Sequence, residues 1–261
     1  MKRITKFILN LTSVGSIVLI ATLSPSPFAV MKGVTAPLVN DGPGDTESGG
    51  PRFIQPREDM DAPSTGTRRG VRGKCGGLLE VSLIALMPEN KIGRTVSDYP
   101  TFFFYLPQPS AELAEFLLLD EKGDVIYQQD MTIKNLSGVI GVSIPANTNV
   151  PPLEVGKKYT WSFSLVCDPD DRSGDKIETG VVRRVELSAD ILRELEEADP
   201  RQKTVIYARE GIWQDAVSNL AAARRANPND PVFQTDWESL LNSVTLGEIA
   251  KEPIVEMEAQ P

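Results

Sequence analysis

Short apolar runs separated by turn-forming residues fill the stretch from 78 to 187, and this pattern limits the possible folds more than any other feature. The clearest run, 159–167, has its apolar residues at alternate positions: Tyr159, Trp161, Phe163, Leu165 and Cys167. Because successive side chains of a strand point to opposite faces, this run predicts a strand with one face in the core and one in water. Seven such runs are present: 78–87, 101–106, 114–119, 125–131, 138–144, 159–167 and 177–187. Seven strands at this spacing predict an antiparallel β-sandwich.

The start of the sixth run points to a particular kind of sandwich. Leu153, Gly156 and Tyr159 follow one another at intervals of three residues. This spacing resembles the tyrosine corner of immunoglobulin-like and fibronectin type III domains, in which the tyrosine hydroxyl bonds to the backbone a few residues upstream. The resemblance implies an immunoglobulin/fibronectin-like sandwich in which Tyr159 opens the sixth of seven strands.

After residue 187 the apolar period becomes helical. Ser188 is a predicted N-cap, and further helical segments are expected at 202–209, 211–227 and 232–249. The segment 211–227 has a succession of glycine, aromatic, small and bulky residues that resembles the second helix of a tetratricopeptide (TPR) repeat. Because a single repeat cannot bury its apolar face alone, we favour a helical hairpin that docks on the sandwich or its neighbours.

The predicted fold class is therefore α+β and mainly β, with five regions along the chain. A signal peptide is expected at 1–29 and a disordered, Gly/Pro-rich linker at 30–74. The β-sandwich domain spans 75–187, the C-terminal helical unit with its TPR-like helix spans 188–250, and 251–261 is expected to be a flexible tail.

The N-terminal segment has the order of charges and apolar residues that export requires. Lys2, Arg3 and Lys6 precede an apolar run at 7–23, and small residues and prolines follow up to Ala29. This order predicts a secretory signal peptide, so that the mature protein would work in the periplasm or outside the cell. The alternative is an uncleaved membrane anchor, for which the run is short. We therefore expect no stable membrane insertion after cleavage.

The linker is basic where it meets the sandwich. Arg68, Arg69, Arg72 and Lys74 lie close together at that point. They would either contact an acidic partner or lie in solvent, and we favour the second interpretation because short charge runs are usually solvated.

Composition excludes several classes of function. The 261 residues include no histidine, which removes the most common general base and every histidine-ligated metal site. Three of the 27 basic residues and none of the 36 acidic residues lie in 1–29, so the mature chain would carry a net charge of about −12. Such a chain repels phosphate backbones, and we expect no nucleic-acid partner.

The two cysteines, Cys75 and Cys167, are the first of two features that invite a chemical interpretation. In an exported chain their default state is a disulfide, which would close a loop of about ninety residues. The alternative is a reactive thiol, which would lack a histidine partner.

An aspartate cluster is the second such feature, and its members are the calcium candidates Asp168, Asp170, Asp171 and Asp175. Carboxylates on a flexible loop suit calcium, but Arg172 stands where an EF-hand needs a third alternate ligand. We favour an acidic hairpin tip, and thus no metal and no cofactor, with calcium as the alternative.

Several short motifs, taken together, resemble an uncharacterised family of exported cyanobacterial proteins known only as domain of unknown function 928. The resemblance spans residues 72–248 and rests on these motifs: 72–75, 85–88, 100–107, 159–168, 171–173, 180–185, Tyr207, 211–215 and 237–241. It implies export from a Gram-negative cell and supports Cys75 and Cys167 as a matched pair. It implies no activity, cofactor or catalytic residue.

The predicted function is a non-enzymatic binding or adaptor protein of the cell envelope, with a protein partner of unknown identity. Its candidate partner contacts are aromatic residues of the helical unit: Tyr207, Trp213 and Trp237. No nucleophile elbow, P-loop or dinucleotide fingerprint is present, and we assign no catalytic residue. The alternative is a carboxylate-dependent hydrolase of envelope glycans or peptides, which would need two carboxyl groups at catalytic separation. A calcium-regulated sensor is a third, weaker hypothesis.

Overall fold

The computed structural model describes residues 50–56, 83–107, 111–146 and 149–256, all of which fall within one compact unit of the chain. The predicted signal peptide, Cys75 and most of the predicted linker lie outside the described residues. Within the described residues, no helix is both long enough and apolar enough to span a bilayer.

Strands come first along the described chain and helices follow. The strands are β1 (Ile84–Ala85), β2 (Ile92–Thr95), β3 (Thr101–Leu106), β4 (Leu113–Leu119), β5 (Val125–Thr132), β6 (Gly138–Ser143), β7 (Lys158–Val166) and β8 (Lys176–Arg184). The helices are α1 (Ala189–Glu197), α2 (Pro200–Arg209), α3 (Trp213–Ala226) and α4 (Pro231–Asn242), with short 3-10 turns η1 (Arg172–Gly174) and η2 (Gly247–Lys251).

The strands form two sheets, one of order β1-β3-β6 and one of order β2-β8-β7-β4-β5. All neighbouring strands are antiparallel except β2, which pairs in parallel with β8. The prediction of an α+β, mainly β fold with two mostly antiparallel sheets before the helices is confirmed. The sequence analysis missed β2, whose four residues include a glycine and an arginine and carry no alternating apolar pattern.

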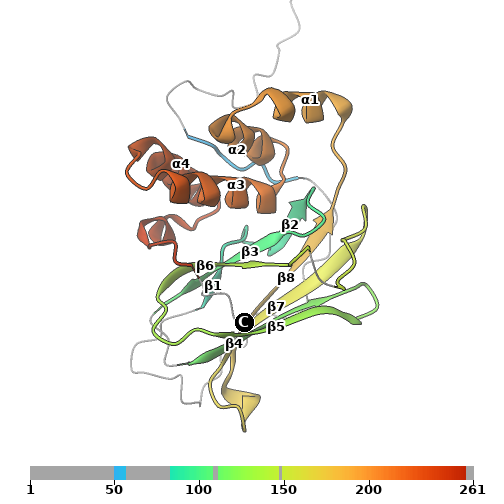
Figure 1. The fold of residues 1–261 in the computed structure, drawn as a ribbon, viewed down its shortest axis with the longest axis vertical. Coiled ribbons are helices and arrows are strands. Elements are labelled where there is room, and N and C mark those ends of the chain that lie inside the picture. The colour runs from blue at the N-terminus through green and yellow to red at the C-terminus, as the bar shows by residue number, and fades with distance from the viewer. Residues whose placement is uncertain (1–49, 57–82, 108–110, 147–148, 257–261) are drawn as a thin grey trace, which may run out of the picture. The chain divides into compact units, whose positions relative to one another are not determined.

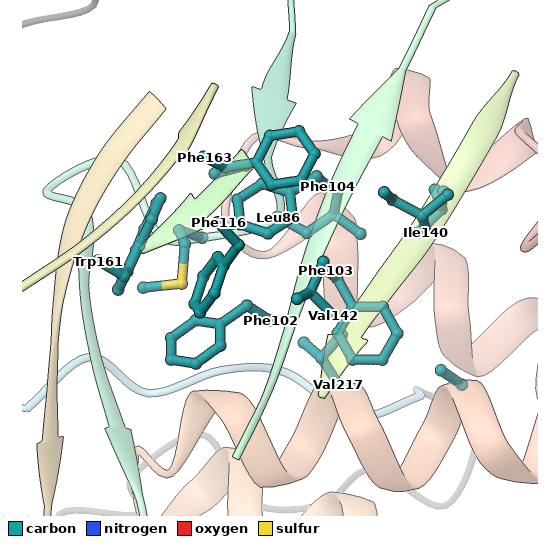
Figure 2. Close-up of a cluster of buried hydrophobic side chains, with 14 of the residues drawn as sticks. Leu86, Phe102, Phe103, Phe104, Phe116, Ile140, Val142, Trp161, Phe163 and Val217 are labelled. Carbon is teal, nitrogen blue, oxygen red and sulfur yellow. The ribbon is translucent and has the colours of Figure 1, made fainter. Parts of the chain in front are cut away.

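Aromatic side chains from both sheets meet in the space between them. Phe102 and Phe104 of β3 face Phe116 of β4 and Trp161 and Phe163 of β7, as Figure 2 shows. Phe104 stacks on Phe163 with ring centroids 4.2 Å apart, and its edge meets Trp161 at 5.6 Å. Large aromatic rings bury much apolar surface and interlock, so this inter-sheet core fixes the two sheets face to face.

The three-stranded sheet is covered on its second face as well. Phe103 points away from the inter-sheet core, and its Cε1 atom lies 3.1 Å from where a Cβ on Gly141 would be. Figure 2 places Phe103 near Val217 of α3, and Figure 1 shows the helices on that side of the strands. Three consecutive buried phenylalanines in β3 therefore reflect a sheet that lies between another sheet and a helical layer.

The strand predicted most clearly, β7, has the expected faces with two exceptions. Tyr159, Trp161, Phe163 and Leu165 are buried as predicted, but Cys167 follows the strand and is partly exposed rather than in the core. On the opposite face, which was expected to lie in water, Ser164 is buried. The predicted tyrosine corner is confirmed, because the Tyr159 hydroxyl accepts a hydrogen bond from the backbone N–H of Glu154 at 2.8 Å.

Side-chain N-caps begin α1, α2 and α4, the last through Asp230, whereas the end of α4 departs from the prediction. Ser188 caps α1 as predicted, with its Oγ accepting from the N–H of Ile191. Asp199 caps α2 with a reciprocal capping box, which the sequence analysis missed. The continuous helix predicted at 232–249 is wrong, because Thr245 takes a positive φ of 66°, which no α-helix contains, and α4 has already ended at Asn242.

Two segments predicted to be flexible are packed where the structure describes them. In the predicted tail, the N–H of Val139 donates to the carbonyl of Pro253 at 2.7 Å, and the N–H of Val255 donates to the carbonyl of Val139 at 2.8 Å. These bonds occupy the backbone groups at the start of β6, which is why the segment follows the sheet. In the predicted linker, Gly50–Pro56 packs on the helices, with N–H groups that donate to Ser243 and Ala208.

Candidate functional site

Residues Gly50–Pro56, which we call the strap, lie across the helical layer as a segment without helix or strand structure (blue in Figure 1). Exposure along it alternates. Pro51 is buried and Phe53 is half-buried, whereas Arg52 and Ile54 are exposed. The strap therefore turns one side to the helices and the other to solvent.

Two hydrogen bonds hold the backbone of the strap. The N–H of Phe53 donates to Ser243 Oγ at 3.0 Å, and the N–H of Ile54 donates to the carbonyl of Ala208 at 3.0 Å. Ser243 Oγ in turn donates to the carbonyl of Leu240 at 2.6 Å, which fixes its lone pairs toward the strap. These hydrogen bonds involve only main-chain groups of the strap. They would therefore hold any extended segment whose N–H groups are free in this place.

One aromatic contact involves a side chain of the strap. Phe53 meets Trp213 edge-on, with ring centroids 5.0 Å apart and planes at 77°. Trp213 is 1% exposed, and its Nε1–H donates to the carbonyl of Leu86 at 2.7 Å. Trp213 thus joins three parts of the molecule: the strap, the first turn of α3 and the residues after β1.

The strap approaches the helices too closely for side chains at two glycines. A Cβ on Gly50 would lie 2.7 Å from Ser239 Cβ and 2.9 Å from Asp236 Oδ1. A Cβ on Gly211 would lie 2.4 Å from Pro56 Cγ, and Gly211 also has a φ of 70° that favours glycine. We define the strap face as the residues that the strap touches: Ala208, Gly211, Trp213, Asp236, Ser239 and Ser243.

An ion pair between the exposed Arg201 and the buried Asp236 supports this face. Asp236 is 1% exposed and accepts two hydrogen bonds from Arg201, from Nε at 2.6 Å and from Nη2 at 3.1 Å. The bond to Asp236 raises the pKa of Arg201. Fork-like pairs of this kind fix direction as well as distance, so α2 and α4 are held in register under Gly50.

The three predicted partner contacts are only partly on the surface. Trp213 and Trp237 are interior residues, with exposures of 1% and 0%, and their role as partner contacts stays a prediction. Trp237 packs under the guanidinium of Arg224 at 5.5 Å. Tyr207 is half-buried on α2, beside Ala208 of the strap face, and stays a candidate.

Sequence analysis missed the strap itself. The signal available was slight: Phe53 and Ile54 stand between Pro51 and Pro56 in a region otherwise rich in turn formers. The bonds that order the strap reach residues more than 150 positions away, such as Ser243, and no local pattern reports them.

A partly buried carboxyl group lies where the helices meet the edge strand β2. Asp215 Oδ2 accepts hydrogen bonds from Thr95 Oγ1 at 2.7 Å and from the N–H of Val96 at 3.1 Å. Burial raises the pKa of Asp215 to about 6, although these two hydrogen bonds act in the opposite direction. Burial, and then the charge of Asp215, also raise the pKa of Tyr207. The two hydrogen bonds that Asp215 accepts link α3 to the end of β2 and the residue after it. Burial at this junction is enough to explain the raised pKa of Asp215.

Three of the four calcium candidates serve local structure through their carboxylates. Asp171 caps η1, and Asp168 accepts from the N–H of Asp170 at 3.1 Å. Asp175 is buried, pairs with Arg172 and accepts from the N–H of Cys167 at 3.0 Å. Among the residues that the structure describes, no three acidic, histidine or cysteine side chains are grouped as metal ligands. Because Cys75 lies outside those residues, its disulfide with Cys167 stays a prediction.

Comparison with known proteins identifies a family without supplying a function. None of the curated proteins compared with the chain is similar to it. A family model described as Domain of Unknown Function (DUF928) matches residues 64–254, which include every described strand and helix and all residues of the strap face, but not the strap itself at Gly50–Pro56. Because this match covers well over half of the sequence, the chain belongs to the DUF928 family.

Proposed function

We propose that the protein is a non-enzymatic binding or adaptor protein of the cell envelope, and that its strap face binds an extended segment of a partner protein. The observation that carries this proposal is the strap. Its backbone N–H groups, one aromatic ring and two close glycine contacts describe how this face holds an extended peptide.

The chemistry of the strap face suits recognition. It offers hydrogen-bond acceptors to a main chain, an aromatic surface to a ring, and small residues that allow close approach. Recognition of an extended peptide needs those three elements and no nucleophile or general base. No observation in the described residues favours the alternative hydrolase, because the one strongly raised carboxyl pKa noted above belongs to a group engaged by Thr95 and Val96.

Location outside the cytoplasm is part of the proposal. It rests on the charged and apolar order of residues 1–29, on the acidic excess of the remaining chain and on the two cysteines. A disulfide between Cys75 and Cys167 would tie the segment before β1 to the end of β7, next to the carboxylate of Asp175. Mass spectrometry of the exported protein tests this part: a chain beginning near residue 30 with no free thiol is expected.

The binding proposal is tested by photo-crosslinking in cells that make the protein. A photoreactive phenylalanine replaces Tyr207, which directly precedes Ala208 of the strap face in α2, and a matched control replaces Val125, which is 54% exposed on β5. The expected result is a crosslink from position 207 to an extended segment of an envelope protein, reduced by a synthetic peptide with the sequence of the strap. Equal crosslinks from both positions, or crosslinks insensitive to the peptide, would contradict the proposal.

A further inference from the structure

We infer that the strap is an internal competitor: it occupies the strap face in place of the partner segment, which therefore carries the same pattern of residues and binds by displacing it. This inference rests on the proposed function and adds to it the class of the ligand and a control on its affinity.

The contacts of the strap define which features a partner segment must share. Inward positions are Pro51, which is buried, and Phe53, whose ring meets Trp213. The side chains of Arg52 and Ile54 face solvent, so they do not contribute to recognition by the strap face. The face therefore selects a proline followed two positions later by an aromatic residue, in an extended chain in which the N–H groups of the aromatic residue and of the residue after it are free to donate.

Glycine positions on both sides set the approach of that segment. Gly50 passes against Ser239 and Asp236, and Pro56 lies against Gly211, where a Cβ would be 2.4 Å from its ring. A partner segment must therefore be small at the position of Gly50. On the face itself, Gly211 must stay a glycine for either the strap or a partner to lie there.

The anchoring of the strap is modest enough for exchange. Within the described residues, two main-chain hydrogen bonds, one edge-to-face ring pair, the buried Pro51 and the close approach of Gly50 and Pro56 to the helices hold it, whereas Arg52, Ile54 and Gln55 stay exposed. Because residues 57–82 join the strap covalently to the strands, its effective concentration at the face is on the order of millimolar. A competitor at that concentration holds the face when no partner is present and yields to a segment that binds more tightly.

The fraction of time that the strap occupies the strap face determines how much it weakens the binding of another segment. A face that is free one tenth of the time binds a segment from outside about tenfold more weakly than an empty face does. Weakening the strap without changing the face should therefore raise the affinity for an added peptide.

The test measures binding of a fluorescent peptide, Gly-Pro-Arg-Phe-Ile-Gln-Pro, to the full chain by fluorescence polarisation. Three proteins are compared: the unchanged chain, Phe53→Ala, which removes the ring that meets Trp213, and the matched control Arg52→Ala, whose side chain is exposed. We expect Phe53→Ala to bind the peptide about tenfold or more tightly than the unchanged chain, and Arg52→Ala to bind like the unchanged chain. A peptide with alanine in place of its phenylalanine should not bind.

The outcomes separate this inference from the proposed function. Equal, measurable binding to all three proteins would overturn the inference while leaving a peptide-binding face. Absence of binding to all three would overturn both. Gly211→Ala guards against a general change in folding, because it closes the face to strap and peptide alike and should abolish binding even in combination with Phe53→Ala.

Discussion

The inter-sheet core and the helix–strand junction are both buried, yet they are held together in different ways. Between the sheets, rings interlock. The ring centroids of Phe104 and Phe163 lie 4.2 Å apart, and both side chains are almost fully buried. At the junction, α3 meets the strands through directed polar contacts, from Trp213 to the carbonyl of Leu86 and from Thr95 to Asp215.

This difference teaches where the molecule tolerates change. Apolar packing has no direction, so a core of rings loses stability in proportion to the volume that a substitution removes. The stability that a hydrogen bond contributes depends on the identity and the distance of its partner. A carboxylate withdrawn from water also lowers the free energy of unfolding by an amount that depends on pH. Volume should therefore govern the inter-sheet core, whereas hydrogen-bond partners and pH should govern the junction.

The largest effect is expected from Phe104→Ala in the inter-sheet core. Phe104 is 1% exposed and touches Phe116, Trp161 and Phe163. Its truncation should lower the free energy of unfolding by about 3–5 kcal/mol, measured as a lower urea midpoint. The control Phe104→Leu keeps most of the volume and should cost about half as much or less. Equal losses from the two variants would contradict a core governed by volume.

At the junction, Asp215→Asn should change how stability depends on pH. Because the pKa of Asp215 is raised to about 6 in the folded chain, the folded state binds the proton more tightly than the unfolded state does. Stability from this group is therefore complete below pH 4 and falls as pH rises through 6. The fall amounts to about 3 kcal/mol, since each pKa unit corresponds to about 1.4 kcal/mol. Urea unfolding at pH 4 and pH 7 should show that the asparagine variant lacks this decline.

Thr95→Val is the matched control for that measurement. Thr95 is fully buried and donates to Asp215 Oδ2, a bond that holds the carboxyl pKa down. Loss of the hydroxyl should move the decline to higher pH while leaving it present. A decline of the same size in the asparagine variant would assign it to another group and defeat the assignment to Asp215.

A smaller effect should distinguish the strap from backbone strain. Gly211 and Gly156 have similar positive φ values, 70° and 83°, but only Gly211 has Pro56 and the carbonyl of Ile54 close to its missing side chain. Gly156→Ala should cost about 1–2 kcal/mol for its backbone conformation alone. Gly211→Ala should cost about 1 kcal/mol more, because it also displaces the strap. Equal unfolding free energies in the two variants would show that the strap adds no stability.

The same contrast explains how much of the fold could be predicted from the sequence. Alternation at 159–167 and the spacing that ends at Tyr159 are local, and both predictions are confirmed by the faces of β7 and by the bond to Glu154. The strap and β2 meet distant residues: Phe53 donates to Ser243, and Gly93 lies so close to the side chain of Gln214 that a Cβ there would clash. Trp213 is a predicted partner contact, but its neighbours Phe53 and Leu86 could not be deduced from spacing.

The smallest effect is expected at the corner of the sandwich, where one polar contact supports apolar packing. Tyr159→Phe removes the oxygen that accepts from the N–H of Glu154 and leaves the buried ring in place. The free energy of unfolding should fall by about 1 kcal/mol, the ordinary net value of one hydrogen bond. Tyr159→Ala should cost several times as much, because it also empties the space of the ring. The ratio of the two losses in unfolding free energy measures how far side-chain volume outweighs hydrogen bonding in the sandwich. A ratio near one would show that hydrogen bonding governs this corner, as it does the helix–strand junction.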